Sequence, residues 1–169
     1  MLLFDEVQVR ERKCVDSKML TYIGLVDYGE GSGETTALAN HRLVFMFCPF
    51  RENYAQPVGV FASRGAAKGL SQLVLQAIVM LENAGAIVDG IVCDGASTNR
   101  KMWTELGVSG KLCTAKHFFE HPMDEDRKVY VFSDVSHLFK CIRNRLLKQR
   151  LLKVKGQWIK WWFYVAVHI

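Results

Sequence analysis

The sequence predicts an α/β fold in which helices pack against a β-sheet. Short apolar runs rich in β-branched residues alternate with stretches of helical spacing, and three of these strands lead into a helix. Half of the 169 residues are hydrophobic and 23% are charged, so the chain can bury a core and is not a disordered tail. The length fits one domain of ordinary size.

The first sixty or so residues are expected to form strands. Val7 and Val9 share one face of the first strand with Asp5, whereas Glu6 and its alternating neighbours share the other face. A polar stretch leads to the second strand, and a loop with three glycines follows that strand. The strands are expected at residues 2–9, 19–27, 43–48 and 58–62, the last two as one interrupted strand or a pair, with the loop at 28–40.

The rest of the chain alternates between helices and strands. Residues 68–83 carry apolar side chains at helical spacing, and Gly85 follows at a natural helix stop. Further strands are expected at 87–93 and 129–132, and further helices at 97–106 and 136–149. The last helix has an apolar side made of Leu138, Cys141, Ile142 and Leu146.

Charge is unevenly distributed along the sequence. There are 22 Lys and Arg against 17 Asp and Glu, a net charge of +5. Residues 127–160 hold ten of the bases and one acid, Asp134, which leaves 12 bases and 16 acids in residues 1–126. A uniformly basic coat is therefore excluded. The basic C-terminal part favours an acidic partner such as nucleic acid.

The cysteines and the hydropathy pattern indicate an intracellular, reducing environment. The five cysteines are widely spaced, odd in number and never form C-x-x-C, so a disulfide scaffold or zinc ribbon is not expected. The N-terminus lacks the shape of a signal peptide. No apolar run approaches the roughly 18 residues that a membrane helix needs, so we expect no membrane partner.

Three aspartates stand at or near the ends of expected strands: Asp5, Asp94 and Asp134. If the strands are neighbours, the carboxylates converge on one rim of the sheet, where α/β proteins bind ligands. Oxygen ligands of this kind suit Mg²⁺ or Mn²⁺, and two such ions can drive phosphodiester chemistry. The alternative is that Asp134 and Asp94 cap the helices that follow, with Ser97 as another cap candidate.

The helix after Asp134 carries polar and basic residues on neighbouring turns. Lysine and arginine at these positions can contact phosphates, and histidine or asparagine can orient on the backbone. The alternative is a solvated cationic face. These candidate DNA-binding residues are His137, Lys140, Arg143, Asn144 and Lys148.

Three weaker signals favour ordinary structure over a site. Cys113, His117 and His121 have C-x3-H-x3-H spacing that a zinc ion could use on a helix, but ordinary surface histidines are the preferred interpretation. The glycines of residues 29–36 do not fit a phosphate loop, because the spacing is short and Glu34 replaces the lysine. The aromatic residues of 158–164 could stack bases, or they are core or interface residues.

Two long motifs give a specific resemblance. Asp94-Gly95-Ala96-Ser97-Thr98-Asn99 and the stretch from Asp134 to Asn144 resemble the D-G-x-S-T-N and D-x-x-H-L-x-K-x-x-R-N signatures of P-element and THAP-type DNA transposases. Residues 4–7, 24–29 and the Gln56-Pro57-Val58-Gly59 turn are similar to the opening of the same domain. The resemblance covers nearly the whole chain in the right order.

The resemblance implies an RNase H-like mixed sheet, with an antiparallel meander followed by alternating helices and strands. It implies that Asp5 and Asp94 are the first two of three catalytic carboxylates that bind two Mg²⁺ or Mn²⁺ ions. In the family a glutamate on a late helix completes the set, beyond an insertion associated with GTP, and none of Glu30, Glu34, Glu105 and Glu120 is a credible substitute. It also implies that His137 contacts DNA near the scissile phosphate.

We therefore expect the N-terminal part of a transposase catalytic domain, inactive alone, with residues 1–155 in the RNase H-like domain and 156–169 beginning a truncated insertion. The fold is expected to be incomplete at its C-terminus, and we expect no N-terminal THAP zinc module in this sequence. The resemblance implies transposon-end DNA as partner, an oligomer of the complete enzyme, nuclear location and GTP only in the missing insertion. A domesticated, non-catalytic DNA- or protein-binding module is the alternative, and an unrelated nucleotide-binding domain is disfavoured.

Overall fold

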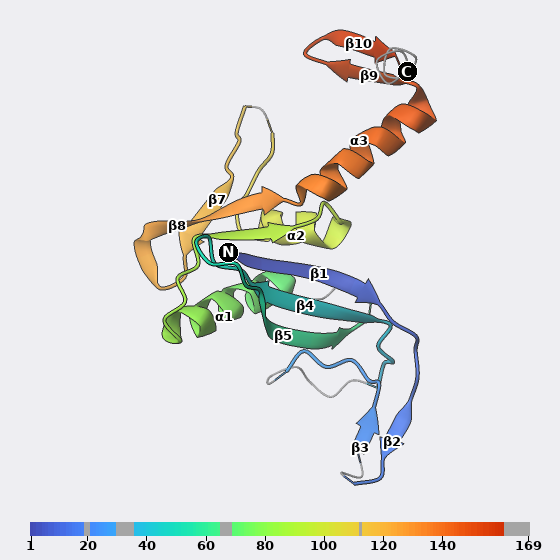
Figure 1. Ribbon diagram of the computed structural model, residues 1–169, viewed down its shortest axis with the longest axis vertical. Coiled ribbons are helices and arrows are strands. Elements are labelled where there is room, and N and C mark those ends of the chain that lie inside the picture. The colour runs from blue at the N-terminus through green and yellow to red at the C-terminus, as the bar shows by residue number, and fades with distance from the viewer. Residues whose placement is uncertain (19–20, 30–35, 65–68, 112, 161–169) are drawn as a thin grey trace. The chain divides into compact units, whose positions relative to one another are not determined.

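The computed structural model describes residues 1–169 except 19–20, 30–35, 65–68, 112 and 161–169. The chain divides into two compact units, Met1–Phe132 and Ser133–Ile169, and each is described by itself (Figure 1). The described residues form a six-stranded mixed sheet, two short two-stranded sheets and three helices. This confirms the predicted mixed α/β class.

The first unit is built on a six-stranded sheet with the strand order β5-β4-β1-β6-β8-β7. Strands β1, β4 and β5 form an antiparallel meander, and β6 lies parallel to β1 on its other side. β7 pairs antiparallel with β8 at the far edge. The strands are β1 (Leu2–Gln8), β4 (His41–Phe47), β5 (Gln56–Ser63), β6 (Gly90–Cys93), β7 (Phe118–His121) and β8 (Asp124–Ser133).

One face of this sheet carries the hydrophobic core. Side chains of a strand alternate between the two faces, so Leu43, Phe45 and Phe47 of β4 all point to the core, where each is buried. Leu2 and Phe4 of β1 lie on the same face, because they pair with Phe47 and Phe45. Both described helices of this unit, α1 (Leu70–Asn83) and α2 (Ser97–Glu105), pack on this core face through Leu70, Val74, Ile78 and Met102.

The opposite face, called here the outer face, is apolar and substantially exposed. Val60 of β5 is 58% exposed and Val7 of β1 is 55% exposed. Phe132 and Tyr130 of β8 are 48% and 41% exposed. Asp5 belongs to the outer face as well. It pairs with Val44, and it follows Phe4, whose side chain points to the core. The outer face is thus a hydrophobic surface with a carboxylate within it.

The strands differ from the predicted ones in two regions of the first unit. β2 (Cys14–Asp16) pairs with β3 (Thr21–Ile23), although 11–18 was expected to be a polar connection and 19–27 one strand. β7 was not predicted, and β8 begins at Asp124 rather than at Val129. These strands are short or begin with charged residues, so they give a weak local signal, and pairing with a neighbouring strand decides their conformation.

The second unit contains α3 (Val135–Gln149) and a hairpin of β9 (Leu151–Val154) and β10 (Gln157–Lys160). Lys155 and Gly156 join the two strands with φ of 47° and 85°, as a two-residue turn of left-handed residues requires. The hairpin was not predicted, and the expected boundary after residue 155 falls inside its turn. The assignment of 156–169 to an insertion stays a prediction, and 161–169 lie outside the described residues.

The predicted apolar side of α3 is only partly buried. Leu146 is buried, but Leu138 is 50% exposed and Ile142 is 38% exposed. Within the described helix Leu146 is the one buried residue, so helical periodicity did not translate into a buried face here.

Candidate functional site

Two of the predicted aspartates come together between neighbouring strands. β1 and β6 run parallel, with Leu2 opposite Ile91 and Leu3 opposite Val92. Continued by two residues, this register brings Asp5 level with Asp94, the residue that follows the last residue of β6. Neighbouring strands lie about 4.8 Å apart, so the two backbones are adjacent at this level.

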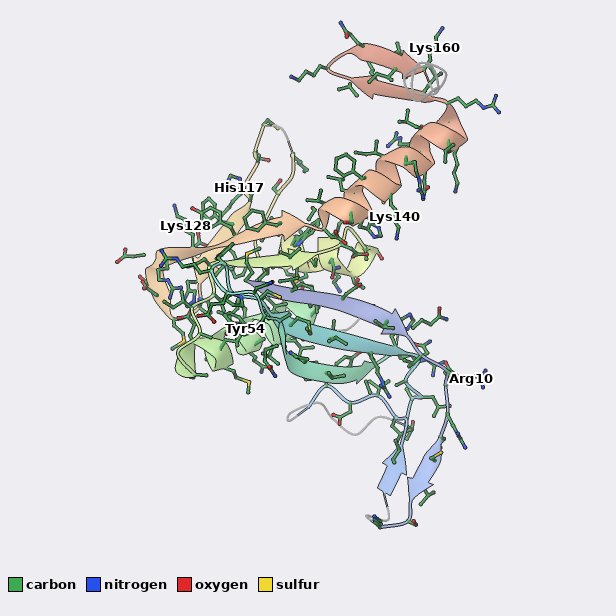
Figure 2. All side chains as sticks on the ribbon, in the orientation of Figure 1. Arg10, Tyr54, His117, Lys128, Lys140 and Lys160 are labelled. Atoms are coloured by element: carbon green, nitrogen blue, oxygen red, sulfur yellow. The ribbon has the colours of Figure 1, made fainter. Side chains whose placement is uncertain are left out.

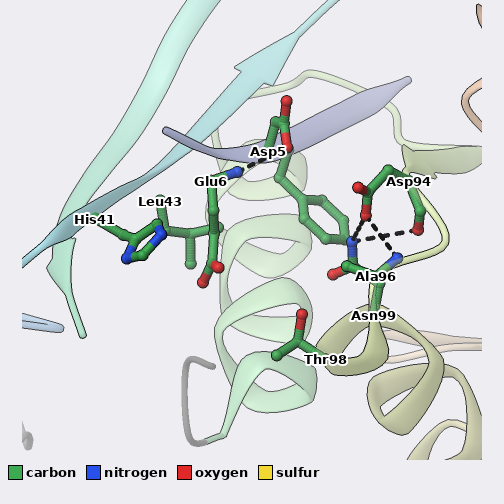
Figure 3. Close-up of a pocket in the computed structure, with 9 residues that line it drawn as sticks. Asp5, Glu6, His41, Leu43, Asp94, Ala96, Thr98 and Asn99 are labelled. Carbon is green, nitrogen blue, oxygen red and sulfur yellow. Dashed lines mark hydrogen bonds between the residues drawn. The ribbon is translucent and has the colours of Figure 1, made fainter. Parts of the chain in front are cut away.

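Both aspartates line one pocket at the carboxyl end of β6. Its volume is about 170 Å³, and polar side chains from β1, β4 and the start of α2 surround it (Figure 3). The lining residues are Phe4, Asp5, Glu6, His41, Leu43, Asp94, Ala96, Thr98 and Asn99. A pocket with several carboxylates in an open crevice beyond a strand end suits a cationic ligand.

The Asp94 side chain is held by the beginning of α2. Its Oδ1 atom accepts a hydrogen bond from the Ala96 N–H at 2.9 Å and one from Asn99 Nδ2 at 2.7 Å. Asn99 also donates to the Asp94 carbonyl oxygen at 3.3 Å, and it is only 7% exposed. These bonds fix the carboxylate against the helix N-terminus, where negative charge is stabilised.

Ser97 does not have the predicted capping position. It is the first residue of α2, and Ala96 occupies the cap position without a side-chain cap hydrogen bond. Asp94 satisfies the Ala96 N–H instead, so the turn from β6 into α2 depends on the aspartate rather than on the serine.

Asp5 and Glu6 leave β1 in opposite directions (Figure 3). The Asp5 Oδ1 atom accepts a hydrogen bond from the Glu6 N–H at 2.8 Å, and the Asp5 side chain is exposed on the outer face. Glu6 points to the other side of the strand, and its Oε1 atom is removed from solvent. The strand thus presents one carboxylate to each side of the sheet at this level.

A buried thiol lies at the end of β6, directly before Asp94. Cys93 is 2% exposed, and burial, together with the negative charges of Asp94 and Asp5, raises the pKa of its thiol to about 12. The two carboxylates thus contribute to the raised pKa of the same thiol.

The donor set of the pocket fits a hard divalent cation. Asp5 and Asp94 supply carboxylate oxygens, and Mg²⁺ usually binds one or two protein carboxylates together with waters and substrate phosphates. Among the described residues, no three His, Cys, Asp or Glu side chains are grouped to hold a metal ion. Asp5 and Asp94 are thus compatible with a cation whose remaining ligands are waters or substrate phosphates.

The third predicted aspartate lies in the other unit and caps a helix. Asp134 is the N-cap of α3, and its Oδ1 atom accepts a hydrogen bond from the Ser136 N–H at 2.9 Å. The predicted DNA-binding residues follow on α3, where Arg143 donates to Asn144 Oδ1 at 3.3 Å. Lys140, Arg143, Asn144 and Lys148 are exposed, and His137 is half-buried.

The C-x3-H-x3-H spacing does not form a metal site. His121 lies on strand β7, where it is 4% exposed and its Nε2 atom is 3.2 Å from Glu82 Oε1. Cys113 and His117 are exposed and precede that strand. The spacing would place the three side chains on one face of a helix, and these residues form a loop and a strand instead.

Four polar residues of the pocket were not identified as site residues from the sequence: Glu6, His41, Thr98 and Asn99. Thr98 and Asn99 belong to the same six-residue motif as Asp94, so the motif itself could have identified them. Glu6 and His41 lie on β1 and β4, and the pairing of these antiparallel strands brings them to the pocket.

The sheet order, the two helices on one face and the paired aspartates define an RNase H-like domain with an acidic pocket. The family described as TNP-like, RNase H N-terminal domain matches residues 1–107. The chain belongs to this family. It is similar to the Drosophila melanogaster "Transposable element P transposase", with 42% identity over 71 residues, which are 42% of this chain and 9% of that protein.

A solved structure extends the similarity to nearly the whole chain. The "Drosophila P element transposase strand transfer complex" matches 99% of the chain with a TM-score of 0.76 and 27% identity. The chain spans 33% of the length of that solved chain. The likeness thus confirms the predicted resemblance to P-element transposases. None of the described helices is long and apolar enough to cross a membrane.

Proposed function

We propose that this chain is the N-terminal part of a DNA transposase catalytic domain, in which Asp5 and Asp94 hold a divalent cation. The observation that supports the proposal is that these two residues line one pocket and come from the neighbouring strands β1 and β6. The domain that holds them belongs to the transposase-related RNase H family. A nuclear location and an oligomer of the complete enzyme belong to the same proposal.

The residues of the pocket have distinct roles in this proposal. Asp5 and Asp94 supply the oxygen ligands, and Asn99 together with the Ala96 N–H keeps the Asp94 carboxylate in place. A bound Mg²⁺ or Mn²⁺ would activate a water or hydroxyl and stabilise the leaving oxygen of a phosphodiester. Glu6 adds negative charge to the opposite side of β1 and strengthens the attraction for cations.

DNA is the proposed substrate, and α3 supplies the second contact. Its exposed bases, among them Lys140, Arg143 and Lys148, would neutralise backbone phosphates. The unit from Ser133 onward contains eight bases up to Lys160 and one acid, so an anionic polymer is the ligand that its charge favours.

Mn²⁺ binding to the purified chain tests the metal site. We expect weak binding, detected as broadening of NMR signals from the pocket, and a loss of at least tenfold in affinity for Asp5→Asn and for Asp94→Asn. Glu125→Gln is the matched control, because Glu125 is an exposed carboxylate near the start of β8, and it should bind as the wild type does. Wild-type affinity in both aspartate variants, with an unchanged fold, would refute the proposal.

A further inference from the structure

A second feature of the first unit lies at the far edge of the sheet, where β7 and β8 pair. Three rings contact one another there: His117 and Tyr130 have centroids 6.1 Å apart and nearly parallel planes, and Phe118 lies 6.0 Å from Tyr130. Two ammonium groups lie over the Phe118 ring, at 4.6 Å for Lys128 and 5.2 Å for Lys116. We call these five residues the aromatic patch, and Figure 2 labels two of them, His117 and Lys128.

The antiparallel register of the two strands builds the patch. Phe118 pairs with Tyr130, and Glu120 pairs with Lys128, so all four side chains lie on one face of the sheet. The residues between them, Phe119 and Val129, are buried in the core. The patch therefore belongs to the outer face, where Tyr130 is 41% exposed and His117 is exposed as well.

One acid, Glu120, lies beside the aromatic patch and offsets part of its positive charge. Lys116 Nζ is 3.0 Å from Glu120 Oε1, and both side chains are partly exposed. An anionic ligand would compete with Glu120 for Lys116, while Lys128 adds a second positive charge beside the rings. Removal of the Glu120 charge should thus strengthen the binding of an anion, an effect with the opposite sign to that of removing a lysine.

The exposed rings of His117 and Tyr130, beside lysines, match a ligand that is both planar and anionic. Proteins bind single-stranded nucleic acid by stacking bases on aromatic side chains while cations follow the phosphates. Bases in an intact duplex are already stacked on each other, so rings of this kind select unpaired nucleotides. We infer that the aromatic patch binds unpaired nucleotides of a nucleic acid strand.

The patch lies on the same face of the same sheet as Asp5. Tyr130 N–H bonds to the Asp89 carbonyl oxygen beside the start of β6, whereas Asp94 follows the end of β6. With about 4.8 Å between strands and 3.3 Å per residue, the patch is roughly 20 Å from the acidic pocket. A nucleic acid strand with a rise of 3.4 Å per nucleotide would span this distance with about six nucleotides. The inference rests on the proposed function only in taking nucleic acid as the partner.

The inference is tested by fluorescence anisotropy with the full chain. The probes are a labelled 12-nucleotide single strand and its duplex, and EDTA is present so that metal binding and cleavage play no part. Tyr130→Ala should weaken single-strand binding about tenfold and duplex binding less than twofold, because only unpaired bases can stack. Tyr130→Phe should bind as the wild type does, since it keeps the ring. Tyr54→Ala is the control for loss of an exposed tyrosine elsewhere.

The charged residues provide an independent arm of the experiment. Lys128→Ala should weaken single-strand binding several-fold and lower the salt slope by about one, whereas Glu120→Gln should strengthen binding. Lys101→Ala on α2 is the control, because its side chain is 78% exposed on a helix of the core face. Equal losses for single strand and duplex would overturn the inference.

Two other results would also overturn it: full single-strand binding by a folded Tyr130→Ala, or equal binding of polyglutamate that depends on Lys128 but not on Tyr130. The latter would identify an acidic peptide as the ligand. A failure of the proposed function is separable, because it appears as loss of Mn²⁺ binding at Asp5 and Asp94 and leaves this experiment unchanged.

Discussion

Asn99 shows at the scale of a single residue how the pocket is organised. It is nearly buried, and its amide bonds to both the carboxylate and the carbonyl oxygen of Asp94. The position of Asp94 is therefore set by the protein before any ligand arrives, which lowers the cost of ordering the site on binding.

Cys93 offers a direct measurement of the burial beneath the pocket. Because its thiol pKa is raised to about 12, the reactive thiolate is almost absent at pH 8. We expect Cys93 to resist alkylation in the folded chain, while the exposed Cys113 and Cys141 react readily, with all five cysteines reacting in denaturant. Mass spectrometry of the alkylated peptides measures this. Labelling of Cys93 as fast as Cys113 in the native chain would contradict the buried position.

At the scale of elements, Glu82 joins the end of α1 to the β7–β8 hairpin. Its carboxylate accepts two hydrogen bonds from Arg127, each at 3.0 Å, and one from the Val88 N–H at 2.8 Å. The Met123 N–H donates to His121 Nδ1, so the ring proton is on Nε2 and faces Glu82. Four segments of the chain thus meet at one side chain that is 13% exposed.

Glu82 gives the unfolding free energy a defined pH dependence. The hydrogen bonds from Arg127 lower the pKa of Glu82 to about 2 from 4.5. Because the folded pKa is the lower one, the stabilisation is complete above about pH 5 and is lost as the pH falls toward 2. Glu82→Gln should cost about 3 kcal/mol at pH 7, and the difference from wild type should disappear between pH 5 and 2.

Urea unfolding at several pH values measures the effect, with the exposed Glu125→Gln as the control. A difference that stays the same from pH 7 to pH 2 would mean that the Glu82 charge does not stabilise the fold.

Helix α3 makes a second prediction at this scale. Arg143→Ala should weaken duplex binding several-fold and reduce the dependence of the logarithm of affinity on the logarithm of salt concentration by about one, because one phosphate contact is lost. Binding titrations at three salt concentrations measure the slope. If the slope does not change, the α3 bases form only a solvated cationic face.

The elements predicted from the sequence are those with a regular apolar pattern. The continuous apolar run of β4 and the helical spacing in α1 gave nearly correct bounds, because both elements bury side chains in the core. β7 was missed because Phe118 and Phe119 point to opposite faces and histidines flank them. Side chains that only strand pairing brings together, such as Phe118 and Tyr130, carry no signal in the sequence before the register is known.

The candidate site was predictable to the extent that single residues define it. Asp5 and Asp94 were singled out as aspartates at or near strand ends, and the family resemblance implied a catalytic role for them. Their adjacency followed only if β1 and β6 were neighbours, which the parallel pairing shows. The bonds that hold Asp94 and the failure of Ser97 to cap α2 depend on backbone geometry that the residue types do not specify.

At the scale of the whole molecule, the chain corresponds to a third of its solved relative. We expect no Mg²⁺-dependent cleavage or transfer of DNA strands by this chain alone, because two carboxylates supply too few ligands to hold two ions in place. Incubation with supercoiled plasmid and Mg²⁺ or Mn²⁺ measures nicking. Nicking that Asp5→Ala abolishes would contradict this expectation.

The two faces of the six-stranded sheet differ in a way that will govern how the chain behaves in the laboratory. One face is sealed by α1 and α2, and the other presents aliphatic and aromatic side chains to water. At low ionic strength the positive charge of the chain keeps the molecules apart; sulfate salts will screen that repulsion and strengthen apolar association. Purified material will consequently precipitate early in an ammonium sulfate series and brighten the dye ANS while still fully folded.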